Sequence, residues 1–160
     1  IALDGRMDDV ESDIATLNSD LGQLTTRVSN LEAASNVAFF SGSQAINNNE
    51  STPVAIVNLD RSGVGTQLAE VTVQIDRRTD LEKRYTRVHL LMRYVEEDET
   101  WYVTRISTTI VLGEPDGVDF TIVTNPTTKV GQVYYTSDYM AGANYSSKLK
   151  FVGKEIPTGV

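Results

Sequence analysis

Nine apolar residues near the start of the sequence recur at spacings that alternate between four and three residues. They are Leu3, Met7, Val10, Ile14, Leu17, Leu21, Leu24, Val28 and Leu31. With Met7 at heptad position a, every member of the series falls at a or d, which form the seam of a coiled coil. A single amphipathic helix packed on its own domain is the alternative, but such a helix usually has a wider apolar stripe. The spacing predicts a coiled-coil stalk over residues 1–35.

One charge pattern occurs twice in this stalk. The stretches "RMDDVE", from Arg6 to Glu11, and "RVSNLE", from Arg27 to Glu32, start 21 residues apart, which is three heptads. In a parallel bundle, an Arg at position g reaches the e-position Glu of the neighbouring chain, because its forked guanidinium matches a carboxylate. The pattern resembles the trimerisation motif of short parallel coiled coils. We predict a homotrimer held by the nine apolar residues and by Arg6, Glu11, Arg27 and Glu32.

Beyond the stalk, apolar residues alternate with polar ones. Eight segments rich in β-branched and aromatic residues are separated by Gly, Pro, Asn and Asp. We predict a β-sandwich head over residues 36–160, most simply an all-β jelly roll. The core-facing positions of its clearest segments are Val71, Val73, Ile75, Val88, Leu90, Met92 and Tyr94.

Composition excludes several classes of function. The chain has 14 Lys or Arg and 22 Asp or Glu, a formal charge of -8, so nucleic acid should repel it. It has no Cys and one His, which argues against disulfides and against a His- or thiolate-ligated metal. That His, His89, lies within a β segment, and no Gly-x-Ser-x-Gly elbow or phosphate loop occurs. We therefore predict no metal, no cofactor and no enzymatic activity.

Two groups of residues in the head are candidate sites. Arg87, His89, Leu91 and Arg93 alternate onto the face opposite the expected core, which suits either a contact between subunits or a site for a small anion. Tyr139 and Tyr145 lie in a stretch rich in Tyr, Ser, Asn and Gly, a composition typical of recognition loops and also of plain loops beside a strand.

A trimeric rod followed by a β head resembles phage and viral fibres and the knobs of the tumour-necrosis-factor-like fold. The stretch "IALDGRMDDVESDIATLNSDLGQLTTRVSNLEAAS", with its "ALDGR" step and its heptads rich in Asp, Ser, Thr and Asn, is similar to the stalk of tail needle proteins from short-tailed phages of enteric bacteria. The resemblance implies a trimeric needle at the tip of the phage tail, which closes the portal channel and meets or crosses the host outer membrane during genome ejection.

The portal-plugging segment of needle proteins precedes their stalk, so we expect the sequence to be a fragment that lacks its contacts with the portal and tail proteins. Our first hypothesis is a structural virion protein, a tail needle whose β knob caps the rod. The alternative is a receptor-binding fibre knob that recognises a glycan or protein on the host surface. A secreted trimeric ligand of the tumour-necrosis-factor type is a third alternative.

Overall fold

Helix α1 spans Ala2–Ser35 and forms one unit of the chain. The computed structural model describes residues 2–35, 38–63 and 67–156. Three threonines in α1 return a hydrogen bond to the carbonyl four residues earlier, as Thr25 does to Leu21 at 2.8 Å. The described a and d side chains of α1, from Met7 to Val28, are 43 to 67% exposed. Along this length the helix therefore presents a continuous apolar stripe to solvent.

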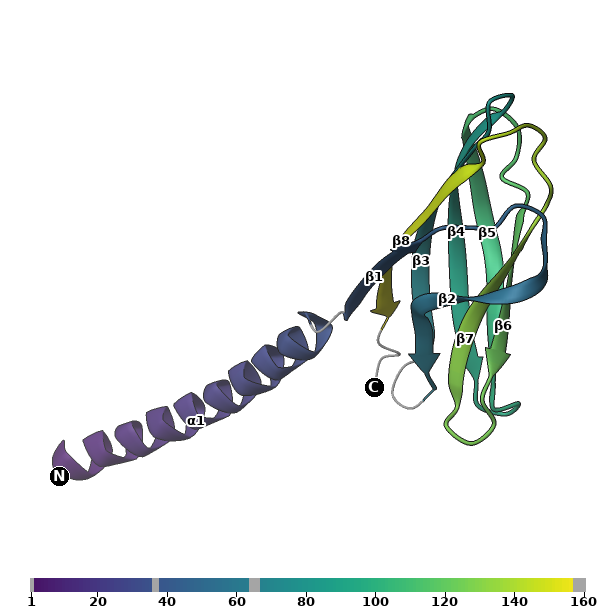
Figure 1. The fold of residues 1–160 in the computed structure, drawn as a ribbon. Helices are drawn as coiled ribbons and strands as arrows, with labels where there is room; N and C mark the ends of the chain where they lie inside the picture. The colour runs from purple at the N-terminus through teal and green to yellow at the C-terminus, as the bar shows by residue number, and fades with distance from the viewer. Residues whose placement is uncertain (1, 36–37, 64–66, 157–160) are drawn as a thin grey trace. The chain divides into compact units, whose positions relative to one another are not determined.

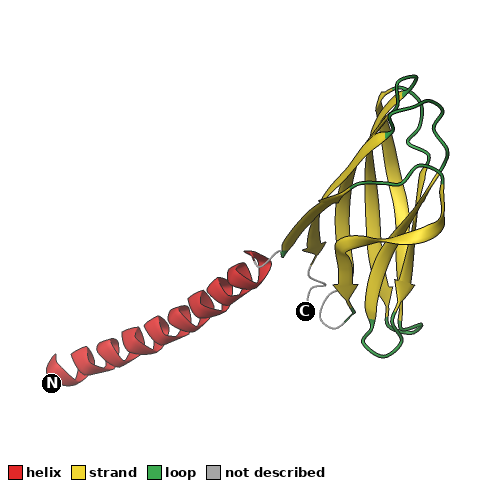
Figure 2. Cartoon of the chain, viewed as in Figure 1, coloured by secondary structure: helices red, strands yellow, loops and turns green. Residues whose placement is uncertain are grey.

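The second unit is Val37–Val160, and we call it the β unit; its described residues form eight strands. Figures 1 and 2 show the strands in two layers. The first sheet has five strands in the order β1-β8-β3-β4-β5, and the second has three in the order β2-β7-β6. The strands are β1 (Phe39–Gln44), β2 (Glu50–Ser62), β3 (Leu68–Arg78), β4 (Lys83–Val95), β5 (Thr100–Leu112), β6 (Val118–Thr124), β7 (Val130–Ser137) and β8 (Ser146–Ile156).

The core lies between the two sheets. Strand β3 pairs with β4 on one edge and with β8 on the other in unbroken antiparallel registers of eleven residue pairs each. Its inward residues, such as Val73, meet those of the three-stranded sheet, such as Ile56 and Val133, and all three are fully buried. Trp101 of β5 closes one end and lies 5.6 Å from Tyr94, ring centre to ring centre. Of the predicted core positions, Tyr94 alone is half-buried and the other six are buried.

A buried arginine joins the strands to the loops at the other end of the core. Arg77 is 0% exposed and donates hydrogen bonds to the hydroxyl of Tyr145 at 3.1 Å and to the carbonyls of Asp116 at 2.6 Å and Asp138 at 2.5 Å. It also donates to the side-chain oxygen of Asn48 at 3.3 Å. One guanidinium thus satisfies polar groups from three loops.

The buried carboxylate of Asp116 continues this network. It accepts hydrogen bonds from the Thr86 hydroxyl at 3.0 Å and the Val118 amide at 2.8 Å, and it forms an ion pair with Arg105 at 3.3 Å. Its sequence context, "EPDG" from Glu114 to Gly117, is typical of a turn and gives no sign that the carboxylate is buried. We call Arg77, Asp116 and their partners the polar node.

The fold class predicted from the sequence is wrong. Residues 2–35 form one helix in a single chain, so the structure holds no trimeric coiled coil; heptad spacing defines one side of a helix but not a partner for it. The β unit is not a jelly roll of the tumour-necrosis-factor type, because β3, β4 and β5 follow one another within one open sheet. A jelly roll arranges its strands as two Greek keys instead. The tight turn at 79–82, where the Thr79 hydroxyl accepts bonds from the Leu81 and Glu82 amides, keeps β4 beside β3.

The polar node should contribute strongly to stability. Replacing Arg77 with Met would leave buried carbonyls without donors, so we expect the free energy of unfolding to fall by about 3 kcal/mol. Urea denaturation followed by circular dichroism measures this. The matched control is Arg78→Met, one residue away on the exposed side of β3, where the change should stay within about 0.5 kcal/mol. Equal losses for both variants would show that Arg77 does not organise this end of the fold.

Candidate functional site

The five-stranded sheet has one face packed on the core and one face open. On β3, β4 and β8, burial alternates strictly along most of each strand, so every second side chain points away from the core. We call this open surface the outer face. It comprises alternate residues from Leu68 to Arg78, from Lys83 to Arg93 and from Lys148 to Ile156, with Phe39, Ser41 and Ser43 of β1 and Tyr102, Thr104, Ser107, Thr109 and Leu112 of β5.

Charge is distributed very unevenly over the β unit. The outer face has seven basic side chains and two acidic ones, a formal charge of +5 in a chain whose total is -8. The seven are Arg78, Lys83, Arg87, Arg93, Lys148, Lys150 and Lys154. The other basic residues of the β unit are Arg77 of the polar node and four residues in ion pairs, namely Arg61, Arg84, Arg105 and Lys129. By contrast, within the part of the chain that the structure describes, no ion pair engages Lys83, Arg87, Arg93, Lys148 or Lys150. Five cations of the outer face are therefore available to a ligand.

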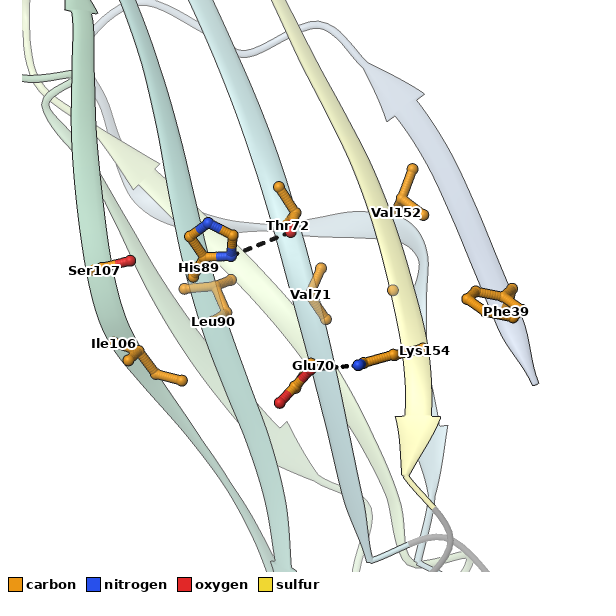
Figure 3. Close-up of a pocket in the computed structure, with 11 residues that line it drawn as sticks. Phe39, Glu70, Val71, Thr72, His89, Leu90, Ile106, Ser107, Val152 and Lys154 are labelled. Carbon is orange, nitrogen blue, oxygen red and sulfur yellow. Dashed lines mark hydrogen bonds and ion pairs between the residues drawn. The ribbon is translucent and has the colours of Figure 1, made fainter. Parts of the chain in front are cut away.

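A central depression of about 440 Å³ crosses the outer face. Figure 3 shows His89 of β4 facing Thr72 of β3, and Glu70 facing Lys154 of β8. The Thr72 hydroxyl lies 3.2 Å from Nδ1 of His89, and Glu70 and Lys154 form an ion pair at 3.0 Å. Phe39 lies at the β1 side of the depression and Ser107 at the β5 side. The depression thus offers hydroxyl and imidazole groups on β3, β4 and β5, and an exposed aromatic ring at its β1 edge.

A second depression, of about 310 Å³, lies at the end of the outer face near the turn 79–82. Lys148 is paired across the sheet with Asp76, and Asp76 with Tyr85. Arg78 holds the Asp76 carboxylate through two hydrogen bonds of 2.6 and 2.5 Å, which raise the pKa of the Arg78 guanidinium. The lining is completed by Gln74, Leu112 and Lys150. Because Arg78 occupies the one carboxylate, the charge left at this end is positive.

The opposite end of the outer face is more acidic. A depression of about 370 Å³ there is lined by Leu91, Arg93 and Tyr102, with Asp98 from the turn between β4 and β5. The Tyr102 hydroxyl donates to Asp98 at 3.1 Å, and this bond with the negative charge of Asp98 raises the pKa of Tyr102, while Arg93 lowers it. The exposed Glu96 and Glu97 of the same turn add negative charge. An anion should therefore prefer the Tyr85 end.

The structure brings one of the predicted groups together. Arg87, His89, Leu91 and Arg93 all lie on the outer face, His89 in the central depression and Leu91 and Arg93 in the acidic end. Their role as an anion site or a subunit contact stays a prediction. Lys148, Lys150 and Phe39 complete the surface but were not identified from the sequence. The alternation of lysines with Leu149 and Phe151 could have placed Lys148 and Lys150 opposite the core, although it could not have shown that β8 pairs with β3.

The two tyrosines of the predicted recognition loop have different environments. Tyr139 is 62% exposed, whereas Tyr145 is half-buried and its hydroxyl accepts the hydrogen bond from Arg77. Tyr145 therefore has a structural part in the polar node. The recognition role of this loop stays a prediction, now with Tyr139 as its accessible residue.

The predicted assembly residues are on α1. Glu11 and Arg27 are exposed, like the apolar stripe from Met7 to Val28. Leu3, Arg6, Leu31 and Glu32 have side chains outside the described residues. Two further searches covered only the described part of the chain: no group of three or more His, Asp or Glu residues there could hold a metal ion, and no helix there is long and apolar enough to cross a membrane.

Comparisons with known proteins give distant likenesses of fold. No family model matches the sequence, and no curated protein matches it. The structure is similar to the tailspike protein of Acinetobacter baumannii phage AM24, with a TM-score of 0.43, 11% identity and coverage of 78% of this chain and 27% of that one. It is also similar to the tailspike protein of Acinetobacter phage vB_ApiP_P1, with a TM-score of 0.39, 15% identity and coverage of 74% and 21%. The chain spans about a quarter of the length of the tailspikes it matches.

The hydrogen-bonded tyrosine at the acidic end of the outer face can be tested by titration. Replacing Asp98 with Asn removes the negative charge that disfavours the tyrosinate, so the pKa of Tyr102 should fall toward its ordinary value. The tyrosinate absorbance, followed against pH and corrected with the same titration of a Tyr102→Phe variant, isolates this hydroxyl. An unchanged or higher pKa of Tyr102 in Asp98→Asn would contradict the assigned contact.

Proposed function

We propose that the chain is a host-contacting part of a phage tail protein, and that its β unit attaches to the surface of the host cell through the outer face. The observation behind the binding role is the open, positively charged face with five cations free of ion pairs in the described structure. Exposed cations on one face repel one another, and a face that keeps such cations is typical of a surface that binds a ligand of opposite charge. The phage assignment rests on the resemblance of residues 1–35 to needle stalks.

The outer face suits binding better than catalysis. Its only imidazole, His89, is engaged with the Thr72 hydroxyl, and its acids Glu70 and Asp76 are engaged with Lys154 and Arg78. The depressions lie on a sheet surface open to solvent, so they do not exclude water from a reacting group. We propose that the β unit is a binding module without enzymatic activity, present in the virion at or near the tip of the tail.

Self-association through α1 would strengthen such binding. Seven large apolar side chains from Met7 to Val28 are exposed on the helix, which is costly in water unless another surface covers them. We propose that the chain forms a homotrimer in which a surface of another copy covers this apolar stripe. Three β units held together would bind a repetitive cell surface much more tightly than one, because the second and third contacts become intramolecular. This favours the receptor-binding alternative, while closure of the portal channel stays a prediction without support from the described residues.

Self-association can be tested on α1 directly. The double variant Ile14→Asp with Leu21→Asp places charges in the apolar stripe, so the trimer should dissociate. Sedimentation equilibrium should give about three times the chain mass of 17.6 kDa for the original protein and the mass of one chain for the variant. The control Ser12→Asp with Ser19→Asp adds the same charge at polar, exposed positions of the helix and should remain trimeric. A monomeric original protein would refute the homotrimer.

Cell attachment can be tested by filling the central depression. Ser107 is exposed on β5 in that depression, so Ser107→Trp should block a ligand without disturbing the core. Thr121→Trp makes the same change on the exposed side of β6 in the other sheet. We expect fluorescently labelled chain to bind intact enteric bacteria saturably, with binding reduced about tenfold by Ser107→Trp and unchanged by Thr121→Trp. Equal binding by both variants would show that the outer face does not attach the chain to the cell.

A further inference from the structure

We infer that the Tyr85 end of the outer face binds a carboxylate-bearing polysaccharide in an extended conformation. This inference rests on the proposed function, since it names the class of ligand that the attachment surface would take. The candidate residues are Arg78, Tyr85, Arg87, Lys148 and Lys150.

The first reason is the position of the cations. Register places Lys150 opposite Gln74 and Gln74 opposite Arg87, so two cations free of ion pairs in the described structure flank an amide across β8, β3 and β4. Neighbouring strands lie about 4.8 Å apart, which puts these charges roughly 10 Å apart at their backbones. Charges spaced along a polymer could engage them together.

The second reason is what surrounds the cations. Tyr85 is half-buried in the depression of about 310 Å³, and Gln74 and Leu112 line the same space. An aromatic ring with an adjacent aliphatic side chain suits the apolar face of a sugar ring, while the amide and the Tyr85 hydroxyl can exchange hydrogen bonds with sugar hydroxyls. Lysine supplies a compact charge for a carboxylate.

The third reason is continuity with the central depression. On β3, Gln74 belongs to the depression near Tyr85 and Thr72 to the central one, two residues along the strand and on the same face. A ligand that extends from Lys148 across Gln74 therefore arrives at Thr72, His89 and Ser107, which present hydroxyl and imidazole groups. The two depressions together form one track for an extended chain.

Two other polyanions fit less well. Duplex nucleic acid carries about one negative charge per 1.7 Å of its axis, so the chain's charge of -8 repels it more strongly than it repels a polysaccharide with one carboxylate per sugar ring. The acidic helix of a second copy could also meet the outer face, since residues 1–35 contain seven acidic and two basic residues. A helix has no flat sugar ring to lie against Tyr85, and its binding would appear as a change of assembly.

The test measures binding of the full chain to sodium alginate, a carboxylated polysaccharide, with dextran as the uncharged probe. We expect alginate to bind, with an affinity that falls as salt rises, and dextran not to bind. Lys148→Gln with Lys150→Gln should weaken alginate binding about tenfold. The control is Thr121→Glu with Thr127→Glu, at exposed positions on β6 and in the turn that follows it. This control lowers the net charge by the same amount and should leave the affinity for alginate within about twofold.

Each other outcome overturns either the inference or the proposed function, and the measurements tell the two apart. Equal loss in both double variants would mean attraction by net charge alone. A short DNA duplex that binds as tightly as alginate through the same lysines would replace the carboxylated polysaccharide with a general polyanion. A changed sedimentation mass in the lysine variant would make the outer face an interface between copies. If cells still bind and alginate does not, the ligand class is wrong but the attachment surface stands; if alginate binds and cells do not, the proposed function fails.

Discussion

The pairing of β3 on both of its edges is the constraint from which the rest of the β unit follows. Its uninterrupted registers with β4 and β8 lock three strands to one another residue by residue. Burial of Val71, Val73 and Ile75 against the smaller sheet then decides which set of side chains is inside. A slip of β3 by one residue would exchange the two sets and bury its acids Glu70 and Asp76. The same registers that build the core therefore also assemble the basic outer face.

The polar node holds the loops in place at one end of the sandwich. Arg77 belongs to the inward set of β3, yet it is charged and fully buried, and it satisfies carbonyls from the loops at Asp116 and Asp138. One residue further along, Arg78 belongs to the outward set and binds Asp76 beside the Tyr85 depression. Consecutive arginines thus have opposite functions because alternation places them on opposite faces. The node anchors the loops, and its neighbour neutralises the one acid at the basic end.

Local patterns in the sequence were sufficient to predict the helix and strands, but not how the strands are arranged in the two sheets. Each of the eight predicted β segments overlaps a strand, and alternation placed His89 and Arg93 outward, because both depend on neighbouring residues. The sheet order depends on long-range pairing, such as that of β8 with β3, which no local pattern records; this is why the jelly roll was wrong and Lys148 was missed. Burial of Asp116 likewise depends on Arg105 and Thr86, distant in sequence. The heptad spacing placed the apolar stripe on α1, but the spacing does not identify the surface that covers this stripe.

We propose that the outer face of the five-stranded sheet is the surface that meets the host. The most direct measurement is hydroxyl-radical footprinting of the full chain, with and without the surface polysaccharide of a bacterium that it binds. We expect oxidation of Tyr85, Leu112 and His89 to fall on binding, while oxidation of the exposed Tyr139 and Val123 does not change. Protection of Tyr139 with unchanged oxidation of Tyr85 and His89 would contradict it, and would move recognition to the loop between β7 and β8.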